Sequence, residues 1–456
     1  MCSIVAMKKR ISIIAIILCI TLACGSFFLY VQSLGNPSQP APSAQKLAAF
    51  QQVRDQRYPV PLIGSLPYPV TPANLAVHSG AAILIDTATG HVLYEKNADQ
   101  VIPPASMTKL VVMYVVFQEI ASGRISLDDV VPLPPESWAV NAPPGSSLMF
   151  LGQGQTVTLR ELLLGLAVAS GNDAAMAVAS YVSGDVESFV QRMNREMELL
   201  GLEKTRFVEP SGYSELNLTT PREFAAFART YINRYPESLM DFHSQPSISY
   251  PQEHNLAEWH RGEGGEQPIF QQSTNKLLGV LPGCDGLKTG FIFESGYNLS
   301  LTAKRGNTRF LSITMKGPGS GSVEGNRYRV ADATTLMEWA FSCFATHYKG
   351  AVAPVAIPVV GGSKNSVTLA PSHTTPLTVP ALLKDRPAAA AADAVTAQMH
   401  LPPFTVAPIA AGDVVGKITY TVGEVVLEEV PLVAMEEVAA GNGFKRLVDK
   451  LAVTFL

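Results

Sequence analysis

The stretch GYNLSLTAKRGNTRFLSITMK, residues 296–316, decides the fold of the larger part of the chain. Apolar and polar residues alternate on both sides of the turn residues at 305–307, which is the pattern of two antiparallel strands in a hairpin. A second hairpin is predicted at 81–99, where two apolar runs flank a turn at 87–90.

Helical patterns fill the sequence between and after these hairpins. They begin at Ser106, end near Ser122, and recur at 158–169, 173–183, 185–201, 220–234 and about 327–345. Two strands, many helices, three strands and a last helix predict an α+β fold, in which helices cover the faces of an antiparallel sheet. The polar segment 237–268 is expected to be an insertion or a long loop.

Length and composition leave room for further domains. The chain has 456 residues, 47% hydrophobic content and a formal net charge of −4. These values suit two or three globular domains and give no electrostatic footprint for nucleic acid. From 349 to 438, short alternating runs rich in Val, Pro and Thr predict a small all-β domain. The larger domain is then expected at 76–348.

The N-terminal segment 1–35 differs in kind from the rest. A basic cluster at 8–10 precedes an apolar run at 11–31, which predicts a cleaved export signal or a retained signal anchor. The sequence TLAC, which ends at Cys24, resembles a lipoprotein cleavage site, so lipidation is a third alternative. All three place the rest of the chain outside the cytoplasm. The Pro- and Ser-rich segment 36–75 is expected to be a tether.

The C-terminal segment 439–456 predicts an amphipathic helix with net positive charge. Its apolar residues at helical spacing are Phe444, Leu447, Val448, Leu451 and Phe455. Such a helix can lie in a membrane interface or dock on the β-domain, and both alternatives stay open. The body of the chain has two cysteines, Cys284 and Cys343, which we expect to be free thiols, although a single bridge stays open.

Three short motifs in the larger domain carry side chains suited to nucleophilic chemistry. They are Ser106-Met107-Thr108-Lys109, Ser170-Gly171-Asn172 and Lys288-Thr289-Gly290. Each motif arises by chance in many chains, but the three in this order indicate one site. Sets of this type are found in penicillin-binding proteins and serine β-lactamases.

Ser106 and Lys109 are predicted to be nucleophile and base. Prolines at 103–104 precede Ser106 at a helix start, where free backbone N–H groups and the helix dipole favour developing negative charge. Lys109 lies one turn further along the same face, within reach of the hydroxyl. An ammonium cannot take the hydroxyl proton, so Lys109 must be uncharged when it acts. Burial and a second cation, Lys288, are expected to lower its pKa.

The remaining motif residues are predicted to bind the substrate and assist proton transfer. Lys288 is expected to attract an anionic substrate group, and Ser170 to relay a proton to the leaving amine. The Asn172 amide can hold a substrate carbonyl and Lys109. Gly290 lets a substrate backbone pair with the strand edge. The backbone N–H groups of Ser106 and Phe291 are expected to form the oxyanion hole.

Other anion and metal sites are not supported by the sequence. GCDGLKTG, residues 283–290, resembles a phosphate-binding loop, but Leu287 and Pro282 occupy the positions where such a loop needs glycine. The histidines in the insertion, His243, His254 and His260, lack the spacing of known metal motifs. We therefore expect no metal and no cofactor.

The chain resembles the D-alanyl-D-alanine carboxypeptidases, which are low-molecular-mass penicillin-binding proteins. The resemblance covers roughly 76–456 and rests on PPASMTKL, GRISLDD, LAVASGNDAAMAVA, DGLKTGF, GYNLSLTA and PLVAMEEVAAGNGF. It implies a five-stranded antiparallel sheet with helices on both faces, of the serine β-lactamase and transpeptidase type, followed by the small β-domain and the terminal helix.

The resemblance also implies a reaction and a location. Ser106 would attack the carbonyl between the two terminal D-alanines of a peptidoglycan pentapeptide, release D-alanine and leave an acyl-enzyme for water to hydrolyse. Lys288 and Thr289 would hold the peptide carboxylate, or that of a β-lactam that acylates Ser106. The tail helix, together with the N-terminal segment if that is retained, would attach the enzyme to the outer face of the cytoplasmic membrane, on the periplasmic side of the cell envelope.

At two points the family pattern does not transfer fully to this chain, and two alternative functions compete with the carboxypeptidase interpretation. Some family members have His after the third motif, where this chain has Phe291, so only the backbone role transfers. Arg327 and Arg329 are both candidates for a further carboxylate-binding residue. A serine β-lactamase is one rival, but its E-x-x-L-N loop needs Glu where this chain has Tyr213. A non-catalytic envelope scaffold of the same fold is the other, and the intact motif set argues against it.

Overall fold

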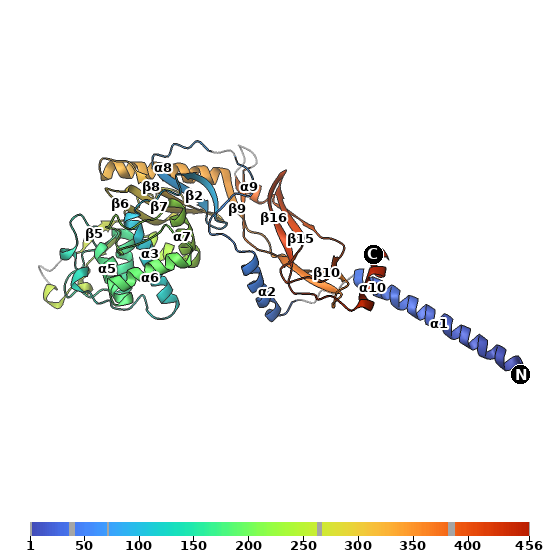
Figure 1. Cartoon of the computed structure of the whole chain (residues 1–456). Coiled ribbons are helices and arrows are strands. Elements are labelled where there is room, and N and C mark those ends of the chain that lie inside the picture. Colours follow the sequence, from blue (N-terminus) through green and yellow to red (C-terminus); the bar gives the residue numbers. More distant parts are fainter. Residues whose placement is uncertain (1, 36–41, 71–72, 262–266, 382–387, 456) are drawn as a thin grey trace. The chain divides into compact units, whose positions relative to one another are not determined.

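The computed structural model describes residues 2–35, 42–70, 73–261, 267–381 and 388–455 (Figure 1). They form two compact units. The larger unit is Pro61–His347 with Pro376–Asp393, and the smaller is Met1–Val60 with Tyr348–Thr375 and Ala394–Leu456. These units divide the chain in more places than the predicted domain boundaries do, because a segment after 375 returns to the larger unit and the segment before 61 joins the smaller one.

The larger unit is built on one sheet of order β1-β3-β2-β8-β7-β6. Its strands are β1 (Gly64–Ser65), β2 (Ala81–Asp86), β3 (His91–Lys96), β6 (Cys284–Ile292), β7 (Gly296–Arg305) and β8 (Thr308–Gly317). The five longer strands are antiparallel to their neighbours, which confirms the predicted α+β fold. The short β1, which comes from the predicted tether, adds a parallel edge.

The two faces of this sheet carry separate hydrophobic cores, as the alternation of side chains along a strand requires. On β2, Ala81, Ile83 and Ile85 belong to one buried cluster, whereas Ala82 and Leu84 belong to the other. The central strand is therefore apolar on both faces and fully covered, since every residue of β2 is buried.

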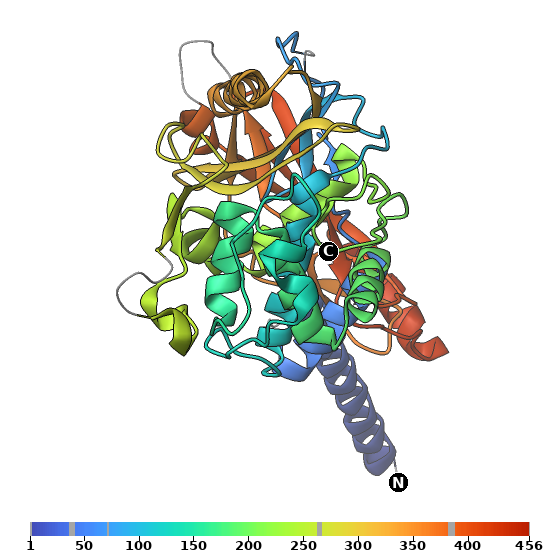
Figure 2. The same ribbon diagram turned by 90° about the vertical axis from the view of Figure 1, so that its left-hand side faces the viewer.

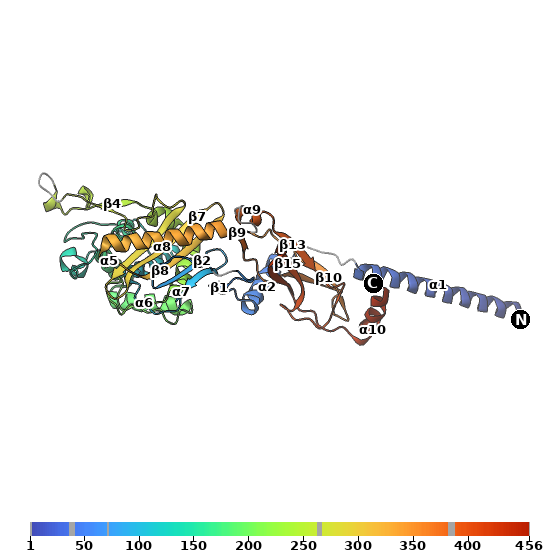
Figure 3. The same cartoon turned by 90° about the horizontal axis from the view of Figure 1, so that it is seen from above.

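Helices cover both faces. The chain has α3 (Lys109–Ala121), α4 (Leu159–Leu164), α5 (Asn172–Ser183), α6 (Val186–Leu199) and α7 (Pro221–Arg234) before the last three strands, and α8 (Ser322–Cys343) after them. Figure 2 shows α8 in orange on one side of the yellow strands and the cyan and green helices on the other. The helix α8 lies along β7 and β8 (Figure 3).

The segment 237–268 has more structure than the predicted loop. It contains the helical turn Leu239–His243 and the strand β4 (Ser247–Tyr250), which pairs with β5 (Ile269–Gln272). The long-loop alternative was wrong, because high polarity is typical of exposed strands as well as of loops. The insertion alternative stays a prediction. Most residues of these two strands are at least partly exposed, so they lack the apolar alternation that marks a strand in sequence.

A segment after 375 completes the larger unit. The strand β12 (Leu377–Pro380) pairs with β9 (Phe344–His347), which follows α8 directly, and α9 (Ala388–Ala392) comes next. The fully buried carboxylate of Asp86 accepts hydrogen bonds from Thr346 of β9 and Thr378 of β12, each at 3.0 Å. The ends of β2, β9 and β12 are therefore tied to one acidic side chain.

The smaller unit holds a sheet of order β13-β15-β16-β11-β10-β14. Its strands are β10 (Val355–Val360), β11 (Ser366–Pro371), β13 (Thr396–His400), β14 (Thr405–Val406), β15 (Val414–Val422) and β16 (Val425–Ala434). The helix α2 (Ala44–Arg57) packs on this unit through Phe50, which lies among Ala370, Val433 and Met435. The prediction of a plain tether over 36–75 missed α2, because one apolar anchor among polar residues gives little helical signal.

Helices at both chain ends also belong to the smaller unit. In α10 (Gly443–Ala452), Asp449 is fully buried and accepts a hydrogen bond from the Gly361 N–H at 2.8 Å. The hydroxyl of Tyr30, in α1 (Cys2–Gly35), also bonds to Asp449. Among the described residues, one segment, Ile16–Ser33 within α1, is long and apolar enough by length and composition to cross a membrane.

Candidate active site

Ser106 lies on the single helical turn Ala105–Thr108 that leads directly into α3, as the Pro-Pro start signal predicts. Ala105 has a φ of 51°, a left-handed conformation that is uncommon outside glycine and often marks functional turns. The turn points Ser106 toward Lys109, and the Lys109 Nζ lies 3.0 Å from the Ser106 Oγ. The two residues of the first motif are therefore in hydrogen-bond contact.

Lys109 is completely buried, and all three of its ammonium positions have acceptors. Besides Ser106, the Nζ contacts the Asn172 Oδ1 at 2.7 Å and the backbone carbonyl of Ser211 at 2.5 Å. Burial lowers the pKa of Lys109 to about 7, while the negative charges of Glu209 and Asp173 act in the opposite direction. A free amine is therefore accessible at neutral pH.

Of the two causes that we expected, burial is confirmed as the one that lowers the pKa of Lys109. The second expected cause, the charge of Lys288, is not among those that shift it. Burial also lowers the pKa of Lys288 well below its usual value, and there the charges of Lys109 and Arg329 add to the effect. Burial thus disfavours the ammonium form of both lysines, and an anion next to Lys288 would favour its ammonium form.

The second motif occupies a tight turn between two helices. Ser170 has a φ of 61° and ends the helical turn Gly165–Ala169, and Asn172 is the first residue of α5. Asp173 fixes this turn, because its carboxylate accepts backbone N–H bonds from the segment 149–151. Buried Ser170 and Asn172 are held in place by the backbone, which suits side chains that must be preorganised.

The third motif lies on β6, the edge strand of the sheet. Lys288 is buried, and its Nζ donates to the Ser170 Oγ at 2.9 Å and to the Thr289 carbonyl at 3.1 Å. The Thr289 hydroxyl donates to the Thr274 hydroxyl at 2.8 Å. Ser170 thus connects the second and third motifs, as Asn172 connects the second and first.

Gly290 is required where β6 passes the nucleophile. A Cβ at this position would lie 2.5 Å from the Pro104 carbonyl oxygen and 3.2 Å from the Ser106 nitrogen. On the other side, the Gly290 carbonyl accepts a hydrogen bond from Arg329 of α8 at 2.5 Å. Arg329 is buried against the Tyr297 ring, whereas Arg327 is exposed beside Glu324. Of the two candidate arginines, Arg329 is therefore the one that contacts the site strand.

Ser106 of the first motif, Asn172 of the second and Phe291, which directly follows the third, line one pocket of about 310 Å³. It is lined by Ser106, Pro144, Gly145, Ser147, Asn172, Gly212, Tyr213, Glu215, Phe291, Ile292, Phe293 and Glu294. Phe291 stacks on Tyr297 with a ring-centroid distance of 4.4 Å and faces Phe293 edge-on. Position 291 thus supplies an aromatic wall, with no titratable ring.

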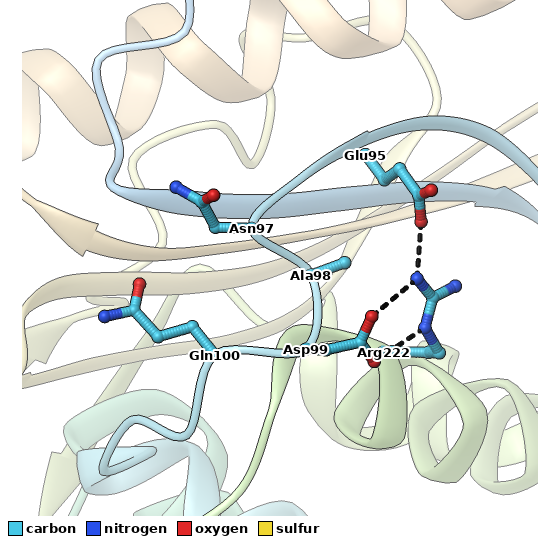
Figure 4. A pocket seen from close by; sticks show the side chains of 6 residues that line it. All are labelled: Glu95, Asn97, Ala98, Asp99, Gln100 and Arg222. Carbon is cyan, nitrogen blue, oxygen red and sulfur yellow. Dashed lines mark hydrogen bonds and ion pairs between the residues drawn. The ribbon is translucent and has the colours of Figure 1, made fainter.

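A larger hollow of about 700 Å³ lies elsewhere and contains no motif residue. There the Arg222 guanidinium bonds to both Glu95 and Asp99 (Figure 4). Each of these charged side chains is engaged in an ion pair, so the smaller pocket beside Ser106 is the better candidate for chemistry. Among the described residues, no group of three or more His, Cys, Asp and Glu side chains could hold a metal ion.

Several residues at the site carry no sequence signal that we recognised. Ser211 contributes a backbone carbonyl, which any residue type could supply. Thr274 reaches the third motif from another part of the chain. Glu209 accepts hydrogen bonds from Ser211 and from Asn217. Arg329, in contrast, was one of the two candidate arginines. Cys284 and Cys343 are both free.

The fold and this site together define the class of penicillin-binding proteins and serine β-lactamases. Within that class, the family model for D-alanyl-D-alanine carboxypeptidase matches residues 69–319, and the model for the penicillin-binding protein 5 C-terminal domain matches 341–440. The chain belongs to the D-alanyl-D-alanine carboxypeptidase family and is a serine-type carboxypeptidase, a hydrolase.

Individual relatives agree with this assignment. The chain is 32% identical to the D-alanyl-D-alanine carboxypeptidase DacC of Escherichia coli, over 83% of this chain and 89% of the relative. It is 31% identical to DacF of Bacillus subtilis, over 66% and 72%. The solved structure of penicillin binding protein 5 from Haemophilus influenzae matches with a TM-score of 0.66 and 29% identity, and covers 81% of this chain and 100% of that chain.

Proposed function

We propose that Ser106 is the nucleophile of the carboxypeptidase reaction and that uncharged Lys109 is its base. The observation that carries this assignment is the 3.0 Å contact between the Lys109 Nζ and the Ser106 Oγ, made by an amine that burial holds near pKa 7. A base is most effective when its pKa lies near the working pH, because it is then both free and basic.

The reaction follows from these positions. The Ser106 oxygen attacks the carbonyl carbon between the two terminal D-alanines of a peptidoglycan pentapeptide, and its proton passes to Lys109. The C–N bond then breaks, and Lys109 passes this proton through the Ser170 hydroxyl to the departing D-alanine amine, which leaves Lys109 uncharged and the remaining peptide as an ester on Ser106. Water attacks the ester carbonyl and gives a proton to Lys109. Lys109 returns that proton to the Ser106 oxygen as the C–O bond breaks and the acid product leaves.

Substrate orientation is assigned to the third motif and to backbone groups. Lys288 and Thr289 hold the terminal carboxylate, which returns the proton to the Lys288 amine. Asn172 holds a carbonyl of the peptide. The substrate backbone pairs with the free edge of β6 beside Gly290, and the N–H groups of Ser106 and Phe291 bind the oxyanion.

Release of D-alanine from a synthetic peptide that ends in D-Ala-D-Ala tests the assignment. We expect Ser106→Ala to reduce release to background, while Ser122→Ala, an exposed serine after α3, retains the wild-type rate. Continued release by a folded Ser106→Ala protein would contradict the proposal.

The same site is proposed to bind β-lactams covalently and to release them slowly. A β-lactam presents a carboxylate to Lys288 and a strained carbonyl to Ser106, and the chain lacks the Glu that activates the deacylating water in class A β-lactamases. Penicilloyl-protein should therefore persist for minutes or longer, on the timescale followed by intact mass. Rapid turnover of a chromogenic cephalosporin would contradict this expectation.

We also propose that the chain acts on the outer face of the cytoplasmic membrane and attaches there through α10. Docking through Asp449 leaves Phe444, Leu447 and Leu451 exposed on the outer side of this helix, and such an apolar face beside basic residues suits a bilayer interface. The apolar segment Ile16–Ser33 supplies an export signal or a second attachment.

Vesicle binding tests the attachment without the N-terminal segment. Protein that begins at residue 36 should float with anionic phospholipid vesicles, and replacement of Phe444, Leu447 and Leu451 by serine should abolish flotation. Equal flotation of both proteins would contradict the role of α10.

A further inference from the structure

The Glu209 carboxylate lies near the site and has no part in the mechanism above. It nevertheless accepts four hydrogen bonds. Its Oε2 accepts the backbone N–H of Ser211 at 2.7 Å and the Ser211 hydroxyl at 2.5 Å. Its Oε1 accepts the Asn217 amide at 2.9 Å and the Ser214 N–H at 3.3 Å. Both oxygens are therefore filled by donors, and the carboxylate is not free to activate water.

These hydrogen bonds hold the loop 209–217 in place next to the helical turn Ala105–Thr108, which carries Ser106. The carbonyl of Ser211 is the 2.5 Å acceptor of the Lys109 amine. Next to it, Gly212 has a φ of +78°, and a Cβ there would lie 1.9 Å from the Ala105 carbonyl oxygen. The buried Asn217 amide also contacts the Thr108 hydroxyl, at 3.3 Å, next to Lys109 in sequence. A change in the shape of this loop thus moves an acceptor of the catalytic amine.

Glu209 also acts on Lys109 by its charge. Two carboxylates influence this amine, Glu209 from the loop and Asp173 from α5. Lys288 of β6 lies in the same site, and its own pKa is lowered by burial and by the charge of Lys109. Glu209 and Asp173 favour the ammonium and partly offset the effect of burial. Asp173 is committed to backbone N–H groups of the segment 149–151, so Glu209 is the carboxylate that contacts an acceptor of Lys109 directly.

We propose that Glu209 is a positioning residue, which holds the Ser211 carbonyl against the amine of Lys109 and places a negative charge near that amine. The inference rests on the proposed role of Lys109. It assigns no contact with substrate to Glu209.

The pH profile of acylation separates this role from a merely structural one. The readout is the rate at which benzylpenicillin acylates the full-length protein, followed by intact mass. In the wild type, the rate should rise with pH through the titration of Lys109 and reach a plateau. Glu209→Gln removes the charge and replaces one acceptor by a donor, so we expect the rising limb to move to lower pH by about 0.5 to 1 unit and the plateau to fall about tenfold.

Two further variants complete the experiment. Glu203→Gln makes the same change in net charge as Glu209→Gln, at an exposed residue near the loop. The pH of the rising limb and the plateau rate of acylation should both keep their wild-type values. Glu209→Asp keeps the charge but shortens the side chain, so the limb should stay within about 0.3 unit of wild type while the plateau falls, because the brace on Ser211 is lost. This variant keeps the test decisive if Glu209→Gln does not fold.

The outcomes distinguish the inference from the proposed function. A wild-type rate that shows no rising limb near neutral pH would refute Lys109 as the base. A normal wild-type limb that Glu209→Gln leaves in place, or a Glu209→Asp plateau equal to wild type, would refute the role of Glu209 alone.

Discussion

At the scale of single residues, the account depends on the protonation of one amine. Lys109 is buried among the Ser106 hydroxyl, the Asn172 amide and a backbone carbonyl. Neutral acceptors of this kind solvate an ammonium poorly compared with water, so burial lowers its pKa. The same contacts aim the free amine at the Ser106 hydroxyl.

Arginine at position 109 should abolish acylation. A guanidinium stays protonated at all accessible pH values and cannot accept the Ser106 proton. We expect Lys109→Arg to lower the acylation rate by about 10³-fold, within the range of general-base contributions. The conservative change Lys204→Arg, at an exposed residue, should have no effect on the rate measured with benzylpenicillin.

At the scale of elements, β6 is held between α8 and the helical turn Ala105–Thr108, which carries Ser106. Gly290 faces the Pro104 carbonyl on one side, and Arg329 binds its carbonyl. The position of β6 beside Ser106 is therefore fixed by two contacts of Gly290, whose partners, Pro104 and Arg329, lie outside the three motifs. Small shifts of β6 should therefore have a larger effect on the acylation rate than on the free energy of unfolding.

A methyl group at 290 tests the first of these contacts. Gly290→Ala should push β6 away from the turn, because the contact at 2.5 Å is with backbone and cannot yield. We expect acylation to fall by about 10²-fold. Gly321→Ala is the matched control, since Gly321 has an extended backbone and open space around it. Similar rates for both variants would show that β6 tolerates the displacement.

The two neighbouring arginines test the second contact. Arg329→Gln removes a buried donor from the Gly290 carbonyl, so we expect a loss of about 1–3 kcal/mol in the free energy of unfolding together with slower acylation. Arg327→Gln removes an exposed side chain that pairs with Glu324 and lies over the Tyr328 ring, and should change the free energy of unfolding by less than about 0.5 kcal/mol. Thermal or denaturant unfolding with acylation rates measures both.

Sequence patterns predicted the elements whose side chains alternate between two environments. The hairpins at 81–99 and 296–316 and the helix after Ser106 have apolar faces that give a clear period. The short β1 and the exposed β4–β5 pair have no such apolar face, so no alternation of apolar and polar residues predicted these strands. The motif residues were predictable because their side chains make the contacts of the site, whereas Ser211 contributes its backbone carbonyl, which does not depend on residue type.

At the scale of the whole molecule, the chain leaves the larger unit after β9 and returns to it for β12. The return is fixed by polar contacts as well as by strand pairing. The Thr378 hydroxyl contacts Asp86 at 3.0 Å and Thr89 at 2.8 Å, and the Tyr68 hydroxyl donates to the Thr378 carbonyl at 2.6 Å. No pattern in the sequence marks this crossing, because it depends on partners hundreds of residues away.

Removal of one hydroxyl tests the importance of this return. Thr378→Val keeps the shape of the side chain but leaves the buried Asp86 with one donor fewer. We expect the free energy of unfolding to fall by about 1–3 kcal/mol, with acylation of the folded protein unchanged. Thr374→Val, at an exposed position shortly before β12, is the control and should change the stability little. Equal stability of the two variants would contradict the role given to Asp86.

The central claim, that free Lys109 activates Ser106, is tested most directly by the pH dependence of acylation in the wild-type protein. Below the pKa of Lys109 the amine carries a proton and cannot act, so the rate should fall about tenfold for each pH unit of acidification, whereas above about pH 7 the amine is free and the rate should level off. Mass mapping should place benzylpenicillin on Ser106. A rate that is constant or falls between pH 5 and 8, or an adduct on another residue, would contradict the account.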